Sequence, residues 1–175
     1  MARQELRGGF NPLTFTGATS VAAADFAAEF AAGQFVGVWR FDASSQDFKV
    51  FRLDAPAFAN SLETIHPRDA LLVLFLPGTS TVFERPMLAP EVQIFNVVVG
   101  WNQIGFTGVD GTSVVDLFDS VALQSVWKFD QPTASWLAYF PGQADFLQGF
   151  DVVNSLDLLF FRVTQTGTLA VPEGV

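Results

Sequence analysis

One short motif occurs twice in this chain, and the second copy follows the first by 91 residues. Residues 10–17 read FNPLTFTG and residues 101–108 read WNQIGFTG. A second pair of segments, residues 39–42 (WRFD) and 127–130 (WKFD), is separated by 88 residues. Because these and several other matches occur in the same order, the sequence predicts two copies of one unit of roughly 80 residues.

Hydrophobic periodicity predicts the same elements in both copies. Strands are expected at 36–41, 48–53 and 70–76 in the first copy, and at 125–129, 136–140 and 158–163 in the second. In the second copy Val114, Leu117, Phe118 and Val121 would share one helix face, with Ser113 as N-cap. In the first copy Gly33 would end the helix.

The expected fold class is α+β, predominantly antiparallel β with one helix per repeat. Each unit would run strand, helix, hairpin, turn, hairpin. Turns at 77–80 and 164–167 would each lead into a short last strand. Residues 1–90 would hold the first repeat with a lead-in, and residues 91–175 a linker strand and the second repeat. The linker, residues 91–99, is rich in Val, Ile and Phe, unlike a flexible tether. No strand signal of equal strength precedes the first copy. We therefore expect one compact unit packed with pseudo-two-fold symmetry.

Composition narrows the classes of partner. The 175 residues include 20 phenylalanines, half of all residues are hydrophobic, and the net charge is -9. The acidic excess is concentrated in residues 91–175, which hold 9 acidic and only 2 basic side chains. Such a surface repels phosphate, so nucleic acid and anionic membranes are disfavoured as partners. No apolar run approaches the roughly 20 residues of a membrane span, so no membrane insertion is predicted.

Side chains that support familiar catalysis are scarce, and the sequence predicts no enzyme and no cofactor. There is no cysteine, which excludes disulfides and thiolate chemistry. The single histidine, His66, precedes a proline and is interpreted as a loop residue, since no Gly-x-Ser-x-Gly motif accompanies it. No histidine pair and no calcium-loop spacing occurs; Asp42 and Asp130, each at the start of a hairpin turn, are interpreted as turn residues, with calcium binding as the second choice. Paired carboxylates for sugar hydrolysis are left open, but nothing selects one pair over another.

Aromatic side chains supply the only candidate ligand site. Trp39, Phe41, Trp127 and Phe129 recur in both copies, which favours a role in the core. Three residues of the second copy, Trp101, Trp136 and Tyr139, instead replace phenylalanines of the first and add a polar group to the ring. They are the candidate ligand-binding residues, suited to a flat platform for sugar.

Residues 100–108 (GWNQIGFTG) and 127–130 (WKFD) resemble a tandem repeat found at the ends of large, uncharacterised bacterial exported or surface proteins. The pattern there is similar to Gly-Trp-Asn, Trp-Thr-Gly and Trp-Arg-Trp-Asp, and this chain has Phe106 and Phe129 where Trp is common. The resemblance implies a noncatalytic module in an envelope or extracellular assembly.

Three functions follow as hypotheses. The first is a noncatalytic structural, assembly or adhesion module of a bacterial surface or extracellular protein, acting on a protein partner or by self-association. The second is a structural component of a virion or other particle. The third is a carbohydrate-binding module that uses its exposed aromatics. The first residues lack the apolar stretch of a signal peptide. If the chain is a domain of a longer exported protein, we expect it outside the cell or on the cell surface. If Met1 is the natural start, we expect it in the cytoplasm or in a virion.

Overall fold

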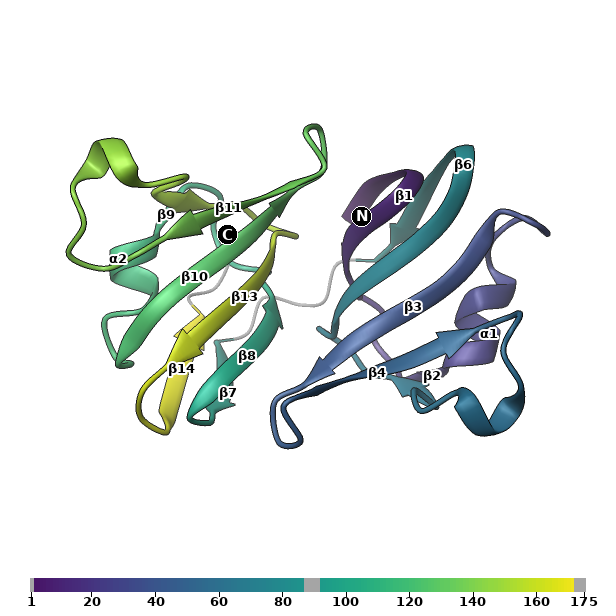
Figure 1. Cartoon of the computed structure of the whole chain (residues 1–175), viewed down its shortest axis with the longest axis horizontal. Coiled ribbons are helices and arrows are strands. Elements are labelled where there is room, and N and C mark those ends of the chain that lie inside the picture. The colour runs from purple at the N-terminus through teal and green to yellow at the C-terminus, as the bar shows by residue number, and fades with distance from the viewer. Residues whose placement is uncertain (1, 87–91, 172–175) are drawn as a thin grey trace.

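The protein is mostly antiparallel β. A computed structural model describes residues 2–86 and 92–171, and the fold is 52% strand and 10% helix. Two four-stranded sheets form two similar halves that lie side by side, and the two short α-helices lie toward the outer sides (Figure 1). The expected predominance of antiparallel β with one α-helix in each half is confirmed, and both helices of this α+β expectation are short.

The first half is built on a sheet with the strand order β1-β6-β3-β4. Its strands are β1 (Ala2–Thr14), β6 (Ala70–Arg85), β3 (Phe35–Asp42) and β4 (Asp47–Arg52). A small ladder joins β2 (Val21–Ala22) to β5 (Thr64–Ile65), and the helical elements are α1 (Ala23–Ala28) and the 3-10 turn η1 (Ala57–Ala59).

The second half repeats this order along the chain. Its main sheet has the order β8-β13-β10-β11, made of β8 (Gly100–Gly105), β13 (Leu158–Val163), β10 (Leu123–Asp130) and β11 (Ser135–Tyr139). Two-stranded ladders join β7 (Gln93–Val97) to β14 (Gly167–Val171) and β9 (Thr112–Ser113) to β12 (Val152–Val153). The helical elements are α2 (Val114–Leu117) and the 3-10 turn η2 (Asp145–Leu147).

The expected linker strand belongs to the second half and does have a counterpart. Strand β7 pairs with β14 as residues 2–7 of β1 pair with residues 80–85 of β6. In the first half these pieces are continuous with the main sheet. The match is hidden in the sequence because ARQELR is polar and QIFNV is apolar, although both lie in equivalent ladders. Glu91 lies outside the described residues.

Both helices are shorter than the periodicity predicted. Helix α1 ends at Ala28, and Gly33 lies beyond it in a turn with φ of 80°. Helix α2 ends at Leu117, so Val121 is not part of it, and Ser113 at the N-cap position makes no side-chain capping bond. The apolar spacing reflects burial against the sheet rather than helix length: Val114, Leu117 and Phe118 are all buried.

The expected turn at 77–80 is absent, because β6 runs without a break from Ala70 to Arg85. The Pro-Gly pair instead lies opposite a register shift between Arg7 and Gly9, and Gly78 has φ of 83°. A bulge absorbs the extra residues and lets both strands bend together. In the second half the corresponding segment does separate two strands, β13 and β14.

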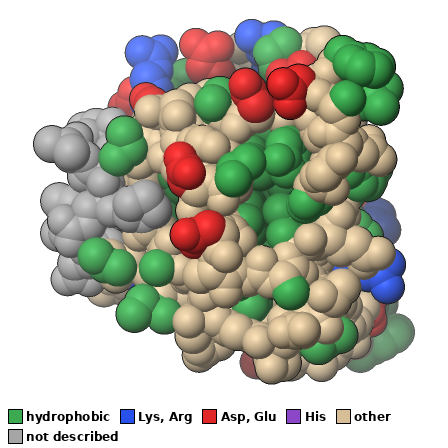
Figure 2. Space-filling view, turned by 90° about the vertical axis from the view of Figure 1, so that its left-hand side faces the viewer, with side chains coloured by type: hydrophobic (Ala, Val, Ile, Leu, Met, Phe, Trp, Pro, Cys, Tyr) green, Lys and Arg blue, Asp and Glu red, His purple; other side chains and the backbone are tan. Residues whose placement is uncertain are grey.

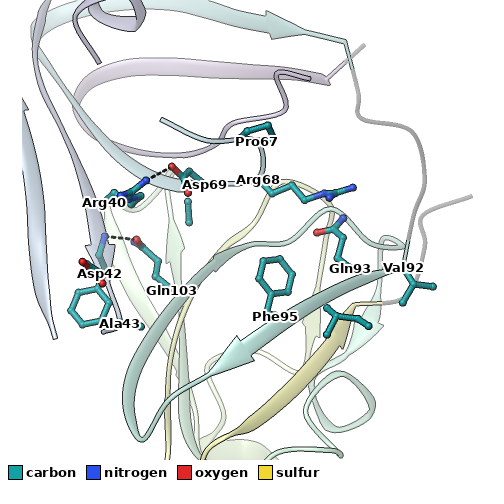
Figure 3. Close-up of a pocket in the computed structure, with 13 residues that line it drawn as sticks. Arg40, Asp42, Ala43, Pro67, Arg68, Asp69, Val92, Gln93, Phe95 and Gln103 are labelled. Atoms are coloured by element: carbon teal, nitrogen blue, oxygen red, sulfur yellow. Dashed lines mark hydrogen bonds and ion pairs between the residues drawn. The ribbon is translucent and has the colours of Figure 1, made fainter. Parts of the chain in front are cut away.

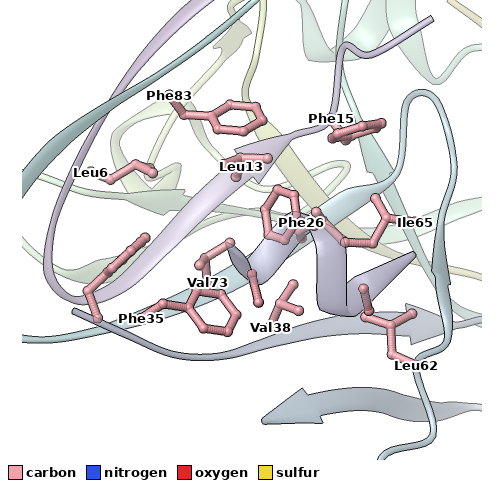
Figure 4. Close-up of a cluster of buried hydrophobic side chains, with 14 residues drawn as sticks. Leu6, Leu13, Phe15, Phe26, Phe35, Val38, Leu62, Ile65, Val73 and Phe83 are labelled. Atoms are coloured by element: carbon pink, nitrogen blue, oxygen red, sulfur yellow. The ribbon is translucent and has the colours of Figure 1, made fainter. Parts of the chain in front are cut away.

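Each half has its own hydrophobic core between one face of its sheet and its helix. In the first half Phe26 of α1 is fully buried and meets Phe15, Phe35 and Phe83 at ring distances of 5.7–6.4 Å (Figure 4). In the second half Phe118 lies 4.9 Å from Phe161. Most core rings meet edge to face or tilted, the arrangement that the ring quadrupole favours.

A buried asparagine holds the bend at the same place in each half. Asn102 accepts a hydrogen bond from the Val98 amide (3.0 Å) and donates to the carbonyl oxygens of Val98 (2.8 Å) and Gly100 (3.2 Å). Asn11 makes the same three contacts with Arg7 and Gly9. Gly9 and Gly100 adopt φ of 97° and 100°, a conformation suited to glycine. The Gly-aromatic-Asn motif thus has a structural role, which is to stabilise a bend of the backbone.

Candidate binding sites at the junction of the two halves

The sheet faces that point away from the two cores meet at the junction and are rich in aromatic rings. Phe41 of the first half lies 4.9 Å from Phe160 of the second, and Phe48 lies 6.2 Å from Phe160. Trp39, Phe41, Trp127 and Phe129 are half-buried on these faces and belong to neither core. The prediction that they are core residues is therefore wrong: they occupy the strand face opposite to the one that packs on the core.

Glutamine side chains join the halves across this junction. The Gln46 amide pairs with the backbone of Trp101, accepting from its N–H at 2.8 Å and donating to its carbonyl at 2.9 Å. Gln103 accepts from the Phe41 N–H at 2.8 Å. Gln131, like Gln103, belongs to the second half, and it donates to the carbonyl oxygen of Glu5 in the first half at 2.9 Å. Each half thus contributes a glutamine from its hairpin turn to the other half.

An aromatic cleft of about 310 Å³ opens at the junction. None of its lining residues is charged: Phe48, Leu72, Trp101, Gln103, Trp127, Trp136 and Phe160. Trp101 stacks on Phe160 at 4.6 Å with nearly parallel rings, and Trp136 meets Phe129 edge to face at 5.3 Å. With 39% of its surface exposed, Trp136 offers an accessible ring at the cleft.

The structure brings together two of the three predicted ligand-binding residues. Trp101 and Trp136 both line the aromatic cleft. Tyr139 does not, because it lies three positions after Trp136 on β11 and points to the opposite face, where it packs on the second core beside Phe150. Successive side chains of a strand alternate between its two faces, so the odd spacing of these two residues already separates them.

A second, polar cavity of about 440 Å³ lies between the end of β3 and strand β7 (Figure 3). Its charged lining residues are two arginines and two aspartates: Arg40, Arg68, Asp42 and Asp69. Arg40 and Asp69 form an ion pair of 2.7 Å. The rings of Phe41 and Phe95 and two amides, Gln93 and Gln103, complete much of the wall. Sequence reasoning missed this cavity, because its walls come from segments far apart in the chain.

Both amides of this cavity contain a buried polar atom without a hydrogen-bond partner among the described residues. Gln103 uses its oxygen to accept from Phe41, and its Nε2 is unpaired. Gln93, only 8% exposed, donates to the Thr107 hydroxyl, and its Oε1 is unpaired. An unpaired buried polar atom costs about 1–3 kcal/mol, so two at one cavity call for a physical explanation.

A counterpart cavity of about 380 Å³ lies at the equivalent place in the other half of the junction. Lys128, Asp130 and Asp157 occupy the positions of Arg40, Asp42 and Asp69. By the 91-residue spacing, Pro12 matches Gln103 and Ala2 matches Gln93, and of these two only Pro12 lines the counterpart cavity. Two other glutamines line it and have partners: Gln4 exchanges hydrogen bonds with the Thr14 backbone, and Gln131 donates to Glu5 and Asn11. The unpaired amides are therefore special to the first cavity.

Asp42, at the rim of the polar cavity, is held in its charged form. The Ser44 hydroxyl donates to the Asp42 carboxylate at 2.6 Å and the Ser44 N–H donates at 2.9 Å. These hydrogen bonds lower the pKa of Asp42 below its ordinary value of 3.8. Asp42 therefore remains ionised throughout the neutral and mildly acidic range.

His66 lies in the loop between β5 and β6, as expected, and its Nδ1 is 2.8 Å from the Ser20 hydroxyl. A catalytic triad also needs a carboxylate on the other ring nitrogen. The nearby Asp69 carboxylate instead accepts from the His66 backbone N–H and pairs with Arg40. The arrangement is that of a turn closed by Asp69, which Asp157 repeats by accepting from the Asn154 N–H.

Two phenylalanines at equivalent positions are almost fully exposed. Phe58 on η1 is 93% exposed and Phe146 on η2 is 86% exposed. The two 3-10 turns lie at opposite ends of the molecule (Figure 1). We call Phe58 and Phe146 the phenylalanine tips. Isolated exposed apolar residues are common, but a ring this exposed at the same place in both halves is not explained by packing within the chain.

The edge strands of both main sheets are covered in part. Outside β4, Ser61 exchanges hydrogen bonds with the backbone of Val50, and Asn60 accepts from the Arg52 N–H. Outside β11, Gln148 and Gly149 bond to Phe140 and Ala138. The junction glutamines cover parts of β1 and β8. Covered edges disfavour pairing with a strand of another chain.

The exposed side of the second half combines apolar and acidic groups. Seen from that side, apolar side chains gather in a shallow hollow with acidic side chains beside it (Figure 2). Among the described residues of this half, Lys128 and Arg162 are the only basic side chains, and Lys128 is paired with Asp157 at 3.1 Å. The acidic excess expected from the sequence thus lies on the surface.

No family model, curated protein or solved structure matches the chain. The described residues contain no group of three or more His, Asp or Glu side chains placed to hold a metal ion. Among these same residues, no helix has the length and apolar character needed to cross a membrane.

Proposed function

We propose that the chain is an internally duplicated, noncatalytic assembly module in which two copies of one unit are related by a pseudo-two-fold axis. The equivalent hydrogen bonds of Asn11 and Asn102, the matching strand orders and the paired junction cavities all support duplication. The resemblance of the Gly-Trp-Asn segments supports a bacterial surface or extracellular setting.

The observation that carries the assembly function is the pair of phenylalanine tips. Burying a Phe side chain gains about 1.5–3 kcal/mol, so two exposed rings provide free energy for association. Because the tips lie at opposite ends of the molecule, one copy can contact two neighbours (Figure 1). A contact between Phe58 of one copy and Phe146 of the next would be heterologous and would extend into a chain of copies.

Charge sets the conditions for this association. With a net charge of -9, copies repel one another at low ionic strength. Salt screens that repulsion, with a Debye length of about 8 Å at physiological ionic strength, and leaves the apolar contact intact. Association through the tips should therefore strengthen as salt is added, the opposite of association through ion pairs.

The experiment is light scattering on a sizing column over a range of protein and salt concentrations. We expect the wild-type mass to rise above that of a monomer with both. Phe58→Ser and Phe146→Ser should each abolish chain growth, whereas Val115→Ser, a change at another exposed apolar residue, should not. Heterologous contact predicts that an equimolar mixture of the two tip variants forms a dimer. A wild-type protein that stays monomeric under all conditions contradicts the proposal.

A second candidate function is carbohydrate binding at the aromatic cleft. It is favoured by the exposed ring of Trp136 beside Trp101 in a lining without charges. Indole rings stack on the C–H face of a sugar and leave its hydroxyl groups in water. This site is separate from the phenylalanine tips.

A further inference from the structure

We infer that the polar cavity of Figure 3 is a binding site for a neutral polyhydroxylated ligand of the size of a monosaccharide. The volume is the first argument. The cavity measures about 440 Å³, within the range of roughly 300–1,000 Å³ typical of ligand pockets and far above the ~30 Å³ that one water occupies.

The chemistry of the unpaired atoms is the second argument. Gln103 Nε2 needs an acceptor, and Gln93 Oε1 needs a donor. A hydroxyl group does both, whereas a carboxylate or phosphate only accepts and an ammonium group only donates. Several hydroxyl groups on one ligand can thus satisfy both amides.

The charge balance selects a neutral ligand. Two arginines and two aspartates line the cavity, and Arg40 and Asp69 pair with each other at 2.7 Å. No excess of either sign is therefore offered to an ion. The planar guanidinium and carboxylate groups each present two polar atoms at a spacing that suits neighbouring hydroxyls. Phe41 and Phe95 provide apolar surface for the C–H groups of the same ligand.

The counterpart cavity shows that the glutamines are not a requirement of the fold. The matching positions hold Pro12, which lines the counterpart cavity, and Ala2, which does not. The glutamines that do line the counterpart cavity, Gln4 and Gln131, have hydrogen-bond partners, so the unpaired amide atoms of Gln103 and Gln93 distinguish the first cavity. This asymmetry also supplies a control, because Gln131 joins the halves beside the counterpart cavity and bonds to Glu5 and Asn11.

The test is a titration of the isotopically labelled full chain followed by amide NMR. The probes are glucose, galactose, mannose, N-acetylglucosamine and glycerol, with glucuronate and inorganic phosphate as anionic comparisons. We expect saturable shifts for one of the neutral sugars at the backbone amides of Phe41 and Gln93, with half-saturation at millimolar concentration. Gln103→Met and Gln93→Met should each weaken binding about fivefold, the effect of one hydrogen bond, while Gln131→Met should not.

Each other outcome overturns the inference. These are no saturable shift with any sugar, tighter binding of glucuronate or phosphate, and wild-type affinity in both cavity variants. Shifts confined to the indole N–H signals of Trp101 and Trp136 would place the sugar in the aromatic cleft instead. Gln103→Met also removes the hydrogen bond to Phe41. If the NMR spectrum of this variant shows that it does not fold, the affinity of Gln93→Met alone tests the inference. The self-association of the phenylalanine tips is measured separately and does not enter this result.

Discussion

Replacing Asn102 with alanine should destabilise the second half by an amount that can be worked out from its contacts. The side chain is buried and makes three hydrogen bonds, at 3.0, 2.8 and 3.2 Å, to the backbone of Val98 and Gly100. At about 1 kcal/mol for each bond, Asn102→Ala should lower the free energy of unfolding by about 3 kcal/mol. For a chain of this size the midpoint of thermal unfolding should fall by about 6–12 °C.

The assay is urea unfolding followed by tryptophan fluorescence, with a thermal melt alongside. Asn96→Ala, a change at an exposed residue of β7, is the matched control and should stay within about 0.5 kcal/mol of wild type. Asn11→Ala repeats the experiment in the first half and should cost at least as much, because Asn11 also accepts from Gln131. The reasoning fails if Asn102→Ala is as stable as the control, since the motif would then owe its recurrence to something other than the bend.

Two further outcomes are expected. Phe26→Ala should lower the free energy of unfolding by about 3–5 kcal/mol in the same urea assay, because Phe26 is fully buried against neighbouring rings and leaves a cavity; a loss below about 1 kcal/mol would show that the core refills. Asp42→Asn should lower the thermal stability at neutral pH and make it depend less on pH, because the lowered pKa of Asp42 stabilises the fold above its ordinary value of 3.8 and this contribution is lost as the pH falls through the folded pKa. Thermal melts should therefore differ most between wild type and variant above that pH and converge below it, and a constant difference would contradict the assignment.

Much of the strand pattern could be predicted from local sequence. The strand at 158–163 is confirmed with both bounds, and the two hairpins lie within one or two residues of their predicted places. The hairpin strands alternate apolar and polar residues, and the strand at 158–163 (LLFFRV) is a nearly continuous apolar run. The helices were overestimated, because apolar residues spaced three and four apart also occur where a short helix and the following loop both pack on a sheet.

The candidate site was harder to predict because it is made between the halves. Trp101 and Trp136 could be selected from the sequence, since they differ from the phenylalanines at the matching positions. The polar cavity could not, because Gln93 and Gln103 acquire their meaning only when β7 and β8 lie beside the end of β3. Nothing in either glutamine's own neighbourhood marks it as buried or unpaired.

The two halves agree where the backbone needs support and differ where they face each other. The buried asparagines Asn11 and Asn102 hold equivalent bends, and the aspartates Asp69 and Asp157 close equivalent turns. At the junction, by contrast, Phe10 corresponds to Trp101, Leu72 to Phe160 and Pro12 to Gln103. A symmetric junction would have two identical cavities and a cleft whose two walls carry the same side chains. Substitutions on one side instead enlarge the aromatic wall of the cleft and place unpaired amides in a single cavity. Departure from symmetry, with the common frame kept, is therefore where a specific binding function is to be sought in this chain.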